Sequence, residues 1–83
     1  MKITVRYFAS VREAVGQGSE QVDTAAASLS ALRDELITRG PAYAQALARG
    51  RSVRMALNQV MSEESAALSE GCEVAFFPPV TGG

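Results

Sequence analysis

A single helical pattern with strand patterns on both sides limits this chain to a small α+β fold. The apolar residues of that pattern recur at the spacing of one helix face: Leu29, Leu32, Leu36 and Ile37. Ser28 is typical of a helix N-cap, and Arg39-Gly40-Pro41 is typical of a helix end. Because only one long helix is expected to cover all the strands, we expect two packed layers, one helical and one a sheet.

Short alternating segments predict the sheet. Residues 2–8 place Ile3, Val5 and Tyr7 on one face, and we expect further strands at residues 19–24, 53–57, 60–61 and 73–77. The first and last strands would be buried best as neighbouring central strands. The prediction is one domain over residues 1–83, a small mixed sheet packed on one main helix, with residues 78–83 as an extended functional tail.

Three shorter features complete the expected order of elements. Ser10 and Glu13 have the spacing of a capping box, which predicts a short helix that stops near Gly16. The Ala-rich segment predicts a helical turn over residues 43–48. Asn58-Gln59 predicts a tight turn between two strands.

Composition excludes most conventional catalytic machinery. The 83 residues contain no His and one Cys, so an N/S metal site and a Ser-His-Asp or Cys-His arrangement are not expected. The net charge is −1, and the seven arginines are scattered as expected for solvated surface charges, so nucleic acid is not an expected partner. No apolar run could span a membrane. The lone Cys72 favours a reducing cytoplasmic location.

The C-terminal Gly82-Gly83 carries the chemistry that the rest of the chain lacks. Without side chains, it can enter a narrow channel, and its carboxylate, with a pKa of about 3.5, is ionised at neutral pH. It could attack ATP to form an acyl-adenylate, which a sulfur nucleophile could then cleave. Pro78-Pro79 favours a stiff, extended path, and residues 80–83 could reach about 13 Å beyond it.

Strand parity distinguishes the two final aromatic residues. Val74 and Phe76 share one face of the last strand, while Ala75 and Phe77 share the other. We expect Phe76 in the core and Phe77 exposed beside the tail as a docking anchor. Met61, at the end of a neighbouring strand, would extend that docking surface.

The segment Phe76-Phe77-Pro78-Pro79-Val80-Thr81-Gly82-Gly83 resembles the C-terminal signature of the small, sulfur carrier subunits of molybdopterin synthase. The resemblance extends to Ala56-Leu57-Asn58-Gln59 and to Phe8-Ala9-Ser10-Val11-Arg12-Glu13, and it covers most of the chain. One position differs, since Gly71-Cys72-Glu73 stands where the family usually has Gly-Asp-Glu. Cys72 is interpreted as a turn residue in place of a tolerant Asp.

The resemblance implies a ubiquitin-like β-grasp fold and a role in sulfur transfer. A ubiquitin-activating-like enzyme would adenylate Gly83 with ATP, and a sulfur donor protein would convert it to a thiocarboxylate. The tail, with Gly82, Thr81 and Val80, would then thread into the large synthase subunit and give sulfur to a cyclic pterin precursor. The implied complex is a heterotetramer whose catalytic side chains lie on the large subunit, with no permanently bound cofactor or metal.

Three alternatives remain open from the sequence. A sulfur carrier for thiamine-thiazole synthesis shares the fold and the Gly-Gly end, although it usually lacks the Phe-Phe-Pro-Pro segment. A carrier for another sulfur acceptor is closely related to both. A ubiquitin-like interaction module whose tail is never activated belongs to a different class.

Overall fold

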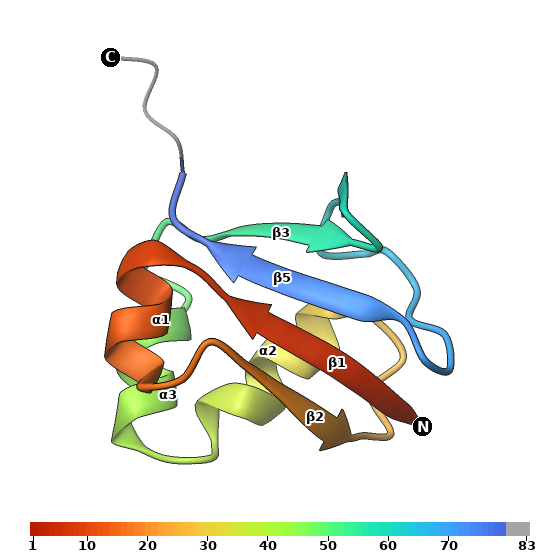
Figure 1. Cartoon of the computed structure of the whole chain (residues 1–83), viewed down its shortest axis with the longest axis horizontal. Coiled ribbons are helices and arrows are strands. Elements are labelled where there is room, and N and C mark those ends of the chain that lie inside the picture. Colours follow the sequence, from red (N-terminus) through yellow and green to blue (C-terminus); the bar gives the residue numbers. More distant parts are fainter. Residues whose placement is uncertain (80–83) are drawn as a thin grey trace.

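A computed structural model describes residues 1–79, which form one five-stranded sheet with three helices on one of its faces (Figure 1). In chain order the elements are β1 (Lys2–Tyr7), α1 (Ala9–Val15), β2 (Ser19–Asp23), α2 (Leu29–Ile37), α3 (Pro41–Leu47), β3 (Arg54–Leu57), β4 (Val60–Met61) and β5 (Glu73–Phe77). The predicted order of strands and helices is therefore confirmed.

The two ends of the chain supply the neighbouring strands at the centre of the sheet. The strand order is β2-β1-β5-β3-β4, with β1 and β5 parallel and every other pair antiparallel. Val5 lies opposite Val74, and Tyr7 lies opposite Phe76. The mixed sheet packed on one main helix is the β-grasp arrangement that the sequence predicted.

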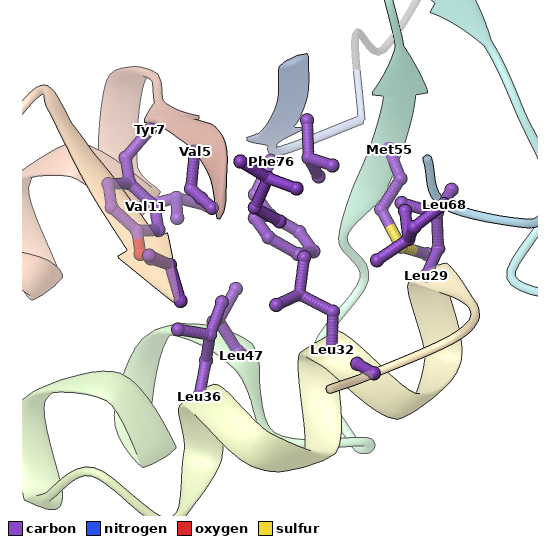
Figure 2. Close-up of a cluster of buried hydrophobic side chains, with 14 of the residues drawn as sticks. Val5, Tyr7, Val11, Leu29, Leu32, Leu36, Leu47, Met55, Leu68 and Phe76 are labelled. Carbon is purple, nitrogen blue, oxygen red and sulfur yellow. The ribbon is translucent and has the colours of Figure 1, made fainter. Parts of the chain in front are cut away.

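The core lies between the sheet and the apolar stripe of α2. Ile3, Val5 and Tyr7 alternate with exposed or half-buried residues along β1, as strand periodicity requires. Phe76 is completely buried and points from β5 toward Leu32, Leu36 and Leu47 of the helical layer (Figure 2). Its predicted place in the core is confirmed.

The main helix begins as its sequence predicts. The Ser28 hydroxyl accepts a hydrogen bond from the Ala31 N–H at 3.2 Å, which caps the first turn of α2. At the other end, Gly40 adopts a positive φ of 153° that suits glycine. Pro41 then occupies the first turn of α3, so the expected helical turn at residues 43–48 starts earlier, at Pro41.

The predicted capping box at Ser10 is wrong. Helix α1 begins at Ala9, its N-cap residue is Phe8, and no side chain caps it. The N–H of Phe8 donates to the Phe76 carbonyl at 3.1 Å, which extends the β1–β5 pairing to this residue. The helix therefore starts directly after the strand, because the Phe8 carbonyl already accepts from Val11 and Arg12.

Arg33 is also placed differently from the prediction of a solvated charge. It is only 4% exposed. Its guanidinium donates to the carbonyls of Leu47 at 2.7 Å, Ala48 at 2.9 Å and Arg51 at 3.2 Å, and it lies 3.5 Å from a Glu64 oxygen. The end of α3 and the loop after it need these donors, and Arg33 supplies them from α2.

Candidate functional site

The predicted tail leaves the sheet at the end of its central strand. Phe77 is the last residue of β5, and Pro78 and Pro79 follow it, both half-buried. Val80, Thr81, Gly82 and Gly83, the predicted threading and reactive residues, lie outside the described residues. The part of the site that the structure describes is thus the surface from which the tail departs.

That surface is the face of the sheet opposite the helices, which we call the outer face. Residues in register across a sheet point to the same side, so the pairings define the members of this face. The outer face includes these residues of four strands: Thr4, Arg6, Arg54, Ala56, Met61, Glu73, Ala75 and Phe77.

The centre of the outer face is apolar and does not protrude, because its side chains are the small ones of Ala56 and Ala75. Ala75 pairs with Ala56, and Ala56 pairs with Met61, which is 60% exposed. Phe77 shares this face but is half-buried, not fully exposed as the sequence predicted. The reason is its position on a central strand, where Arg54 lies directly opposite.

Phe8 is an exposed aromatic residue that the sequence reasoning did not include in the site. It is 40% exposed, has an extended backbone, and continues the alternation of Thr4 and Arg6. The guanidinium of Arg6 lies over its ring, 5.3 Å from the centroid. The alternation of residues along β1 could have predicted this exposure, because Phe8 has the same parity as the outward-facing residues Thr4 and Arg6.

Hydrogen bonds between the β3–β4 hairpin and β5 fix the position of Met61. Asn58 and Gln59 have positive φ angles of 51° and 69°, as a two-residue hairpin turn requires. Asn58 bonds Glu73 twice, through its N–H to the Glu73 carbonyl at 2.8 Å and through its side-chain oxygen from the Glu73 N–H at 2.9 Å. The position of β4 is therefore fixed relative to β5.

A depression of about 400 Å³ lies on the helical side of Pro78. Val11 of α1, Ala46 of α3, and Arg51 and Val53 of the following loop contribute to its wall. Pro78, which directly follows Phe77 of the outer face in the chain, thus lines this depression.

Within residues 1–79 no reactive cluster accompanies these surfaces. No group of three or more His, Cys, Asp or Glu side chains there could hold a metal ion. The Cys72 side chain is 3% exposed and belongs to the core. Its interpretation as a turn residue is confirmed, because the Cys72 N–H donates to the Ser69 carbonyl at 3.1 Å and closes a turn, but the burial of its side chain was not predicted. No helix of residues 1–79 is long and apolar enough to cross a membrane.

A hydrogen-bond network around Glu20 lies away from the outer face. It shifts the pKa values of Glu20 and Tyr7. Burial by itself would raise the pKa of Glu20, but hydrogen bonds from Tyr7 at 2.7 Å, Tyr43 at 2.8 Å and Arg39 at 2.8 Å outweigh it and lower this pKa below 4.5. Burial and the same Glu20 contact raise the pKa of Tyr7 far above its usual range. Both shifts reflect contacts that favour an ionised Glu20 carboxylate and a neutral Tyr7 phenol.

Comparison with known proteins gives consistent matches over nearly the whole chain. The molybdopterin synthase sulfur carrier subunit of Escherichia coli K12 is 41% identical over 81 residues, which cover 98% of this chain and 99% of the relative. The protein of the same description from Haemophilus influenzae is 38% identical with the same coverage. The crystal structure of SAMP1 from Haloferax volcanii superposes with a TM-score of 0.77 at 25% identity, with complete coverage of both chains.

Residues 5–83 of this chain match the ThiS family. This segment includes the second half of β1 and all of β3, β4 and β5, and extends through Gly82-Gly83. With this match and curated relatives of 38% and 41% identity over 99% of their length, the chain belongs to the ThiS family.

Proposed function

We propose that this chain is the sulfur carrier subunit of a molybdopterin synthase and that Gly83 is the residue that carries the sulfur. The observation that carries the proposal is the end-to-end match to curated sulfur carrier subunits of that synthase. The Gly82-Gly83 end, inside the segment that matches the ThiS family, supplies the carboxylate that this chemistry needs.

The chemistry proceeds in two activation steps. The Gly83 carboxylate attacks the α-phosphate of ATP on a ubiquitin-activating-like partner enzyme, and pyrophosphate leaves. Hydrosulfide delivered by a donor protein then attacks the acyl carbon, AMP leaves, and a thiocarboxylate remains. ATP is thus consumed on the partner, and the carrier keeps no cofactor. We place these steps in the cytoplasm, where thiols stay reduced.

The thiocarboxylate then donates its sulfur to the cyclic pterin precursor inside the large synthase subunit. The proposed complex is a heterotetramer of two small and two large subunits. The catalytic side chains belong to the large subunit, because this chain contains no His and its one Cys is buried. The carrier is therefore not an enzyme on its own.

The outer face supplies the docking surface in this proposal. Phe77, Met61 and Phe8 present apolar side chains on it, while Pro78-Pro79 directs residues 80–83 into the partner. These residues hold the folded domain on the surface of the large subunit. The end of the chain then reaches the pterin precursor through Val80, Thr81, Gly82 and Gly83.

The hairpin offers a matched pair of variants for this docking surface. Met61 and Val60 are 60% and 65% exposed and, as consecutive strand residues, point to opposite sides. Met61→Ser should weaken binding of the large subunit by about tenfold, while Val60→Ser should change it little. Calorimetric titration measures both, and equal effects of the two variants would show that the outer face is not the docking surface.

The acceptor is tested by reconstitution. Thiocarboxylated chain, mixed with the large synthase subunit from the same organism, should convert the cyclic pterin precursor to molybdopterin, which is detected by its fluorescent oxidation product. Failure here, with sulfur delivered in a thiazole-forming assay, would assign the chain to thiamine synthesis. No thiocarboxylate at all, with the activating enzyme present, would favour an interaction module.

A further inference from the structure

Two arginines of the outer face lie on either side of the proposed apolar docking surface. Arg6 of β1 is in register with Ala75, and Arg54 of β3 is in register with Phe77, so the central strand β5 runs between them. Two interstrand spacings and a two-residue offset place their Cα atoms about 12 Å apart. A partner that covers β5 must therefore meet both guanidinium groups.

Neither arginine is used to hold the fold together. Among residues 1–79, the only carboxylate that pairs with the Arg6 side chain is Glu73 at 3.9 Å, at the limit of an ion pair, and the Arg54 side chain has no hydrogen bond or ion pair. By contrast, Arg39 bonds Glu20 at 2.8 Å and Arg49 bonds Asp34 at 2.8 Å. Both outer-face arginines keep donors available for a partner.

Arg6 is nevertheless held in a defined place. Its guanidinium lies 5.3 Å from the centroid of the Phe8 ring, a cation–π contact that orients the charge over the apolar surface. Its donors can therefore meet an acceptor with less loss of side-chain freedom than a free arginine would suffer.

Burying these charges without acceptors would oppose binding. An apolar partner surface over Phe77 would remove water from both guanidinium groups, and an unpaired charge costs several kcal/mol to bury. A carboxylate opposite each arginine removes that penalty and excludes partners that present basic or wholly apolar surfaces. The whole chain has a net charge of −1, so this positive pair is a local feature.

We infer that Arg6 and Arg54 select the large subunit, recognising two carboxylates that lie about 12 Å apart on either side of its apolar docking surface. The inference rests on the proposed function, and it adds the charge pattern that distinguishes the cognate partner from others.

The test is the affinity of the chain for the large subunit from the same organism, measured at about 50 mM and about 500 mM salt. The double variant Arg6→Gln/Arg54→Gln should bind at least about tenfold more weakly at low salt, and the difference should shrink at high salt. Arg6→Lys/Arg54→Lys should restore much of the affinity, because it keeps both charges. Arg12→Gln removes a charge from α1, off the outer face, and should bind like the wild type.

Each outcome decides a separate point. A double Gln variant that binds like the wild type, or a loss that is the same at both salt concentrations, overturns the charge pairing while the proposed function stands. A loss confined to the activating enzyme overturns the choice of partner. If the wild-type chain does not bind the large subunit at all, the proposed function and this inference both fail.

Discussion

Arg33 is a residue whose importance depends on groups far from it in the sequence. It donates to three backbone carbonyls at the end of α3 and in the following loop while almost completely buried. Arg33→Leu should lower the free energy of unfolding by about 2–4 kcal/mol, because those carbonyls lose their donors. Arg49→Leu, at an exposed ion-pair cluster, should cost less than about 1 kcal/mol. Urea unfolding measures both, and similar values would contradict the structural role.

Gln59 occupies a backbone conformation that suits glycine better. Its φ of 69° places it in the left-handed region, in the turn that holds β4. Gln59→Gly should raise the free energy of unfolding by about 0.5–1 kcal/mol, since glycine adopts this conformation without steric cost. Gln45→Gly, inside α3, should lower it by about 1 kcal/mol. Thermal unfolding distinguishes the two, and destabilisation by both would argue against strain at Gln59.

Single-residue predictions from the sequence succeeded where local pattern decides the outcome. Ser28 caps its helix and Phe76 lies in the core, because spacing and strand parity fix both. Arg33 could not be placed in this way, since its burial depends on carbonyls of a different helix. Cys72 likewise has a turn-like sequence context, but the packing of the core around it determines its burial.

Among the elements, α3 is attached to the strands β1 and β2 through the network around Glu20. Tyr7 of β1 and Tyr43 of α3 both donate to the same Glu20 oxygen, while Arg39 donates to the other. The stacked rings of Tyr7 and Phe76 connect this network to the core (Figure 2). The network therefore holds the helical layer in register with the edge of the sheet.

The lowered pKa of Glu20 predicts a pH dependence of stability. A carboxyl with a folded pKa below its ordinary 4.5 stabilises the fold above that pH and loses this contribution as pH falls through the folded pKa. Glu20→Gln should thus be less stable than the wild type by about 1–2 kcal/mol at pH 7, and the gap should narrow below about pH 4.5.

Denaturant unfolding across this pH range measures the gap. Tyr43→Phe, which removes one donor to Glu20, should show a smaller loss of the same sign. A gap between the wild type and Glu20→Gln that stays constant down to pH 3 would contradict the stabilisation of the Glu20 carboxylate.

The order of elements was predictable, but two of their starts were not. Helix α1 begins at Ala9 because Phe8 still pairs with β5, a long-range contact that no local capping pattern reveals. Helix α3 begins at Pro41, directly after Gly40, where the Ala-rich composition alone suggested only a turn further on. Pairing between distant segments decided the first boundary, and backbone geometry at Gly40 decided the second.

At the scale of the whole molecule, one face of the sheet packs against the helices and encloses the core, and no helix of residues 1–79 covers the other face (Figure 1). Strand parity in the sequence placed Phe77 on the outer face, while the reactive role of Gly82-Gly83 stays a prediction because these residues lie outside the described part of the chain. The sequence did not predict the joint surface with Phe8 and Arg54, because that surface exists only once β1 and β3 pair with β5.

The central claim is that sulfur is bound to this chain at the carbonyl of Gly83. Purified chain, incubated with its activating enzyme, ATP and a sulfur donor, is measured by intact and fragment mass spectrometry. The account predicts a mass increase equal to the exchange of one oxygen for sulfur, located on Gly83 and absent from a chain that ends at Gly82. Sulfur on Cys72 instead, or equal loading of the shortened chain, would contradict it.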